Sequence, residues 1–140
     1  MKTLQIILTL TLLAAGVAVG AETKTIRDAS GRMVGTVTTD GSRTTYRDAQ
    51  GRITATASNH GGSTTTYRDA QGRIIGTRTT HGSGSSFRDA QGRTVATSYS
   101  SGNNTTYRDA QGRITATAAN HGGSTTTYRD AQGRIKGTKR

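Results

Sequence analysis

A six-residue motif, Arg-Asp-Ala-Gln/Ser-Gly-Arg, recurs six times along this chain at intervals of 20 or 21 residues. A period this short is one supersecondary unit, and such a unit buries its apolar side chains only against its neighbours. Each unit holds roughly two large apolar side chains, worth about 1.5–3 kcal/mol each when buried, against a backbone cost of about 1–2 kcal/mol per ordered residue. One unit cannot fold alone, so the repeat predicts a single stacked or closed array. The copies begin at Arg27, Arg47, Arg68, Arg88, Arg108 and Arg129.

The motif predicts a tight turn. In the second unit, Asp48 can accept hydrogen bonds from the turn backbone, and Gly51 can adopt a positive φ without steric cost. The spacing fits a three-residue hairpin loop with a glycine bulge, in which Asp48 faces Arg52 and forms an exposed ion pair. We therefore assign a structural role in the turns to Asp28, Gly31, Asp48, Gly51, Asp69, Gly72, Asp89, Gly92, Asp109, Gly112, Asp130 and Gly133.

Threonine-rich stretches between the motifs predict strands, because β-branched and small residues alternate in them. Residues 53–58 and 64–68 are an example, joined by a second turn at 59–62. Two strands per unit predict an all-β repeat protein, an antiparallel meander of about 12 short strands that curls or closes. The alternative is a β-solenoid with one unit per rung. In the expected register Tyr46 lies opposite Thr54 and Ile53 opposite Arg47, which puts aromatic and aliphatic residues on different faces.

The N-terminus has the features of a cleaved signal peptide. Lys2 precedes an uncharged, largely apolar run, and small residues stand before Glu22. We predict a signal peptide at 1–21 and one domain of six β-hairpin repeats at 22–140, without a transmembrane segment in the mature chain. The chain has no Cys, so neither a disulfide nor a lipid on cysteine anchors it. The expected location is the periplasm, the cell surface or the extracellular space of a bacterium.

The charge is strongly positive and evenly spread. The chain has 19 Lys and Arg against 8 Asp and Glu, and loss of Lys2 with the signal peptide leaves a net charge of +10. Regular cation spacing favours a long anionic partner: lipopolysaccharide, an acidic polysaccharide or extracellular DNA. Solubility alone is the alternative explanation of this charge. The candidate polyanion-binding residues are Arg47, Arg52, Arg68, Arg73, Arg88, Arg93, Arg108, Arg113, Arg129 and Arg134.

No residue pattern indicates an enzyme, a cofactor or a metal site. The carboxylates are spread one per unit beside arginines, whereas acid–base catalysis needs them paired in a pocket. His60, His81 and His121 stand in the second turns and are expected to be turn residues. We expect a structural or binding protein. The alternative is a self-assembling, amyloid-like fibre of the biofilm matrix, and a remote one is ice binding by Thr38, Thr56, Thr79 and Thr117.

The segment 65–74, Thr-Thr-Tyr-Arg-Asp-Ala-Gln-Gly-Arg-Ile, resembles the YD repeat of Rhs and teneurin-type proteins. Those repeats read roughly Tyr-Asp-x-x-Gly-Arg-Leu over about 20 residues, and the resemblance covers all six units. It implies strand-turn-strand units. An arginine stands here between the aromatic residue and Asp, at positions such as Arg47 and Arg68. In that family the repeats wind a hollow shell around a toxic cargo, a role that six units do not imply for this chain.

Overall fold

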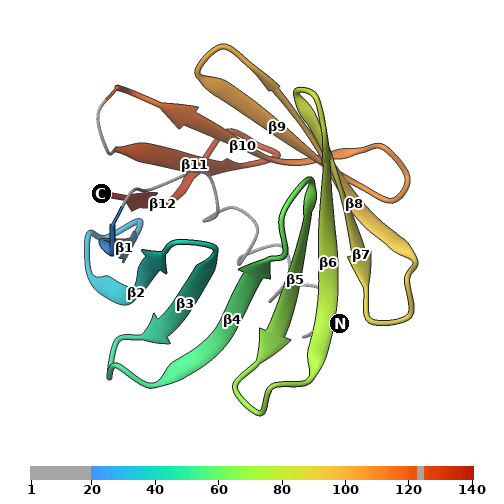
Figure 1. Cartoon of the computed structure of the whole chain (residues 1–140). Helices are drawn as coiled ribbons and strands as arrows, with labels where there is room; N and C mark the ends of the chain where they lie inside the picture. The colour runs from blue at the N-terminus through green and yellow to red at the C-terminus, as the bar shows by residue number, and fades with distance from the viewer. Residues whose placement is uncertain (1–19, 123–124) are drawn as a thin grey trace.

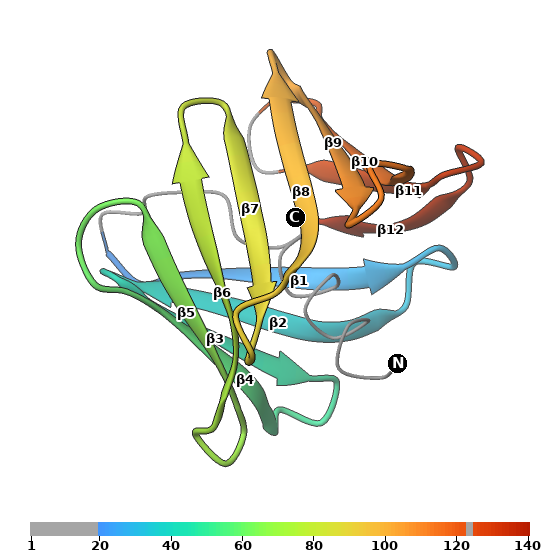
Figure 2. The same ribbon diagram turned by 90° about the vertical axis from the view of Figure 1, so that its right-hand side faces the viewer.

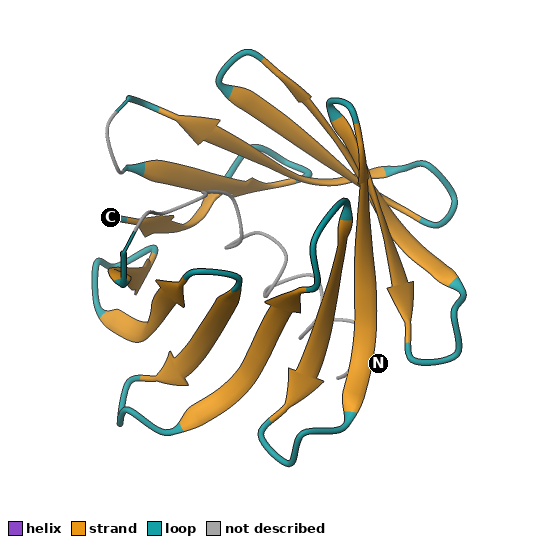
Figure 3. Cartoon of the chain, in the orientation of Figure 1, coloured by secondary structure: helices purple, strands orange, loops and turns teal. Residues whose placement is uncertain are grey.

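The computed structural model describes residues 20–122 and 125–140, which form twelve strands and, within these ranges, no helix (Figures 1 and 3). Residues 1–19 of the predicted signal peptide lie outside the described residues. The described part of the chain contains no apolar helix of a length that could cross a membrane. The strands are β1 (Glu22–Asp28), β2 (Met33–Asp40), β3 (Arg43–Asp48), β4 (Ile53–Asn59), β5 (Thr64–Asp69), β6 (Ile74–His81), β7 (Gly84–Asp89), β8 (Thr94–Ser101), β9 (Asn104–Asp109), β10 (Ile114–Asn120), β11 (Thr126–Asp130) and β12 (Ile135–Lys139).

The strands form one closed antiparallel barrel. Each strand pairs with its neighbours in sequence, and β1 pairs with β12 to close the wall (Figures 1 and 2). The predicted meander that closes is therefore confirmed. The solenoid alternative is wrong, because equivalent residues of successive solenoid rungs would stack in parallel, whereas every pairing here is antiparallel.

The motif turns have the predicted geometry. The Asp48 backbone N–H donates to the Arg52 carbonyl at 2.9 Å, and the Gly51 N–H donates to the Asp48 carbonyl at 3.0 Å. Gly51 has a φ of 80°, which only glycine adopts without strain. The same pair of hydrogen bonds recurs in all six units. The hairpin loop is thus three residues long, Ala49 to Gly51, followed by the strand that starts beside Arg52.

A second bulge follows each turn, and it corrects the expected register. Arg47 does lie opposite Ile53, but Tyr46 lies opposite Ala55, not Thr54. Thr54 is the extra residue of a β-bulge, which shifts the side-chain alternation of the rest of β4 by one position. A register shift at the same place occurs in every motif hairpin.

The bulge decides which side chains form the core. Because the alternation shifts, Ala55 and Ala57 point to the same side as Tyr46 and are buried with it. Without it, threonines would share that face. Within each motif hairpin, the residue across from the aromatic side chain, or from Ile26 in the first unit, is a glycine or an alanine, which leaves room for a ring. These small residues are Gly35, Ala55, Gly76, Ala96, Ala116 and Gly137.

The aliphatic residue after each turn lies on the outside. Ile53, Ile74, Ile114, Ile135 and Met33 are 42–47% exposed, whereas Tyr67 and Phe87 are 1% exposed. The aromatic residue before each motif turn and the aliphatic residue after it thus occupy opposite faces of the wall, as the sequence predicts. The core is an inner layer of aromatic rings and alanines with Val37 among them, and Ile26 and Ile75 pack against it.

This division of the faces predicts unequal effects of truncation. Tyr67→Ala removes a ring from the buried layer and should lower the free energy of unfolding by about 3–5 kcal/mol. Ile74→Ala, in the same hairpin, removes a half-exposed side chain and should cost less than about 1.5 kcal/mol. Urea unfolding followed by circular dichroism measures both. Equal losses in the two variants would contradict the inside-outside assignment.

Candidate anion-binding rim

The six motif turns lie at one end of the barrel. In an antiparallel meander, alternate turns fall at the same end, so the glycine-rich second turns lie at the other end with the start of β1 and Arg140. We call the motif end the arginine rim. It consists of residues 27–32, 47–52, 68–73, 88–93, 108–113 and 129–134.

Each aspartate of the rim holds its turn through several hydrogen bonds. Oδ1 of Asp48 accepts the backbone N–H groups of Gln50 and Arg52, both at 2.9 Å. Oδ2 accepts Nε–H of Arg52 at 2.8 Å, which completes an ion pair. The carboxylate is thus used within the turn, and the six units repeat the pattern.

The two arginines of each motif differ in their contacts. The first, such as Arg47, donates from Nη1 to the carbonyl of the turn glycine, Gly51, at 2.7 Å. The second, such as Arg52, pairs with Asp48 while its side chain stays 76% exposed, against 23% for Asp48. The six second arginines are 74–83% exposed. Their charge and many of their N–H donors therefore face solvent, although each is paired with a carboxylate.

The positive charge of the rim is distributed evenly over its six turns. Each motif contributes two arginines and one aspartate, so six turns carry a net charge of +6. All ten sequence-predicted polyanion residues lie on this rim. Arg27 and Arg32 hold the same positions in the first unit and were not among those ten candidates. The repeat itself would have identified them.

The turn hydrogen bonds lower the pKa of the rim carboxylates. At Asp28 the hydrogen bond from the Ser30 hydroxyl has the largest effect, and with the N–H donors of Arg32 and Ser30 it lowers the pKa to about 2 despite desolvation. At Asp109 the largest cause is the side-chain hydrogen bond from Arg113. At Asp48, Asp69, Asp89 and Asp130 desolvation alone would raise the pKa, but the hydrogen bonds from the turn outweigh it.

The other sequence candidates lie away from the rim. His60, His81 and His121 are in or beside the glycine-rich turns, where Nε2 of His121 lies 3.2 Å from Oγ1 of Thr127. Among residues 20–122 and 125–140, no three His, Cys, Asp or Glu residues gather as metal ligands would. Thr38, Thr56, Thr79 and Thr117 lie on four different strands around a curved wall.

One candidate residue was missed from the sequence. Arg78 replaces a small side chain on the inner face of β6, where the preceding and following units have Ala57 and Ser98. The available signal was a charged residue at a repeat position where four of the other five units have a small or apolar side chain and the sixth unit has Lys139.

Two comparisons with known proteins identified no relative of this chain. No protein-family model matches this chain, and no curated protein matches it significantly. The resemblance to YD repeats stays a prediction from the motif.

The lowered carboxylate pKa values predict acid sensitivity. Because these groups titrate lower in the folded state, their contribution to stability is complete above the ordinary aspartate pKa near 3.8 and is lost as the pH falls toward about 2. Urea midpoints should therefore change little between pH ~7 and ~5 and fall between pH ~4 and ~2.

Asp48→Asn is the matched variant for this test. It keeps an oxygen acceptor in the turn but loses the titrating charge that pairs with Arg52. Its stability should be lower at neutral pH and should decline less steeply in acid. An acid decline as steep as that of the unaltered protein would contradict a stabilising role of the Asp48 carboxylate.

Proposed function

We propose that this protein is an exported, non-catalytic β-repeat protein that binds an anionic polymer or cell-surface component through the arginine rim. The observation that carries the proposal is the ring of six turns, each with a net charge of +1 and a largely exposed arginine. A ring of fixed cations attracts several phosphates or carboxylates of one polyanion at once.

The rigidity of the rim supports this proposal. The arginines are held by the Asp pair or by the turn carbonyl, so less side-chain freedom is lost when an anion binds. A guanidinium that donates one N–H to Asp48 has four further N–H donors in its planar fork. The turn interactions therefore position the cations without neutralising the rim.

The outer wall beside the rim favours a partner with an apolar part. Ile53, Ile74, Ile114 and Ile135 stay about half exposed, each opposite a rim arginine on the paired strand. Cations next to exposed aliphatic side chains suit an anionic lipid such as lipopolysaccharide better than DNA, whose outer surface is uniformly charged.

Export remains part of the proposal. Every described strand lies after the predicted cleavage site, and β1 begins at Glu22. Removal of residues 1–21 would thus leave all twelve strands present. We place the protein in the periplasm or at the cell surface, where such anionic polymers and lipids are found.

Charge-matched double variants test the role of the rim. Arg52→Gln with Arg113→Gln removes two rim cations from opposite sides of the barrel, whereas Arg43→Gln with Arg140→Gln removes two from the other end. The rim variant should weaken binding of a labelled DNA duplex by about tenfold and reduce the salt slope by about 2. The Arg43→Gln, Arg140→Gln control should change the affinity for DNA and its salt slope little. Lipopolysaccharide micelles serve as the second probe.

The salt dependence decides whether binding is electrostatic. Affinity should fall steeply between about 50 mM and 200 mM salt, because each phosphate contact releases counterions. Affinity that is equal at both concentrations, or that falls equally in the two double variants, would overturn the rim as the binding surface. Circular dichroism of both variants checks that the barrel is intact.

Self-assembly into a fibre is a second candidate, and one observation favours it. The closing pair β1–β12 is short: it shares three register pairs and one further pair of backbone hydrogen bonds, between Thr25 and Arg140, whereas the other strand pairs share four to six register pairs. Opening of this seam would expose two strand edges, which the closed barrel lacks. Closure itself favours the binding proposal, because no edge is free for strand addition.

Locking the seam tests the fibre candidate. Arg27 and Thr138 are paired across it, so Arg27→Cys with Thr138→Cys allows a disulfide to hold it shut. We expect the unaltered protein to stay monomeric in light scattering over days. Growth of dye-binding fibres that the oxidised double variant abolishes would instead establish assembly through an opened seam.

A further inference from the structure

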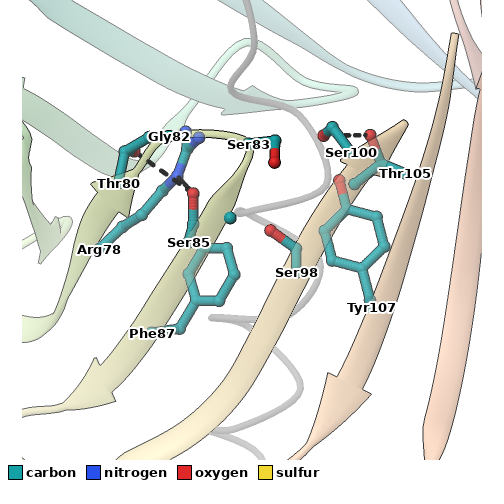
Figure 4. A pocket seen from close by; sticks show the side chains of 11 residues that line it. Arg78, Thr80, Gly82, Ser83, Ser85, Phe87, Ser98, Ser100, Thr105 and Tyr107 are labelled. Carbon is teal, nitrogen blue, oxygen red and sulfur yellow. Dashed lines mark hydrogen bonds between the residues drawn. The ribbon is translucent and has the colours of Figure 1, made fainter. Parts of the chain in front are cut away.

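A cavity of about 150 Å³ lies inside the barrel wall near the glycine-rich turns, at the end away from the arginine rim (Figure 4). It is bordered by β6, β7, β8 and β9. Two aromatic side chains, Phe87 and Tyr107, stand on one side of it, and hydroxyl groups from serines and threonines face it from several strands. A cavity of this volume holds about one six-membered ring.

Arg78 supplies the charge of this cavity. Its Nε–H donates to Oγ of Ser85 at 3.1 Å, and its guanidinium carbon lies 5.9 Å from the centre of the Phe87 ring. Ser85 is itself 7% exposed. None of the described residues that line the cavity is acidic, so the lining carries a positive charge.

The hydroxyl groups of the cavity are arranged in hydrogen-bonded pairs. Oγ of Ser100 lies 2.9 Å from Oγ1 of Thr105, and Oγ1 of Thr80 lies 3.3 Å from Oγ of Ser85. The Ser98 hydroxyl faces the space between Ser85 and Tyr107 (Figure 4). Each hydroxyl both donates and accepts, which suits a ligand that carries several hydroxyl groups of its own.

Arg78 and Ser98 depart from the residues that most other units have at this repeat position, so the barrel fold does not require them. At the position of Arg78 and Ser98 the other units have Val37, Ala57, Ala118 and Lys139. Three of these four units thus build the same barrel wall with an apolar side chain at this position. Lys139, which is also buried, lies six strands from Arg78 and so in the opposite half of the barrel.

We infer that this cavity binds one acidic sugar ring, such as a hexuronate. Arg78 would receive the carboxylate, since a guanidinium fork matches a carboxylate in shape and charge. Phe87 and Tyr107 would contact the C–H face of the ring, and Ser98, Ser100 and Thr105 would bind its hydroxyl groups. The ring could be a free sugar acid or the terminal residue of an acidic polysaccharide. The site is independent of the arginine rim, which lies at the other end of the barrel.

Titration calorimetry of the purified protein with galacturonate, galactose and acetate tests this inference. Galacturonate should bind saturably and at least tenfold more tightly than either of the others, because galactose lacks the charge and acetate lacks the ring. Equal binding of galactose would overturn the role of Arg78. Equal binding of acetate would reduce the site to a simple anion site and overturn the sugar assignment. No saturable binding of galacturonate would overturn the whole inference.

Two variants test the site with substitutions that the barrel tolerates, because other units already have alanine at the same repeat position. Arg78→Ala and Ser98→Ala introduce the residue that Ala57 and Ala118 supply at the same repeat position. Arg78→Ala should weaken galacturonate at least tenfold, and Ser98→Ala about threefold. Arg88→Gln, which removes one cation from the rim, should leave galacturonate binding unchanged. An equal loss in Arg88→Gln would overturn the interior location.

The affinity for trigalacturonate distinguishes a polysaccharide end from a free sugar acid as the ligand. Tighter binding than the monosaccharide supports the end of a polymer, and equal binding supports a free sugar acid. DNA binding measured on Arg78→Ala distinguishes this site from the rim. It should be unchanged, so failure of one proposal leaves the other testable.

Discussion

The bulge that follows each motif turn is the feature on which the rest of the structure depends. A glycine in a left-handed conformation closes the turn, and a further residue, such as Thr54, is then left without a partner across the strands. This single extra residue turns the alanines toward the aromatic rings and sends the threonines outward. Without it, neither face of the wall would be apolar enough to form a core.

The aspartate network explains why a chain with so few large apolar residues can keep this geometry. Each carboxylate fixes the loop by accepting two backbone N–H groups and one arginine N–H. The register of every motif hairpin is therefore set by contacts within that hairpin. The glycine-rich turns at the other end lack this network and vary in length, but the core pairing across them is the same, with Val37 opposite Tyr46 and Ala57 opposite Tyr67.

The same residues also produce the charge that we propose for function. Because the turn needs one aspartate but contains two arginines, each unit leaves one positive charge at the rim. Closure of the barrel then brings six such charges, distant in sequence, to one end. The interior cavity arises differently, from departures of one region from the repeat. Arg78 on β6 and Ser98 on β8 line it, at a position where three of the other four units have the apolar residues Val37, Ala57 and Ala118.

The sequence by itself determined the repeat unit, the two kinds of turn, the strand content and the ten arginines of the candidate rim, because these depend on contacts within one hairpin. The tertiary structure alone decided the rest. The Tyr46–Ala55 pairing could not be read from spacing, since a bulge costs little locally and is favoured only once the alanines are buried. Closure depends on β1 meeting β12 across the whole chain, and the cavity beside Arg78 exists only because closure encloses the inner face.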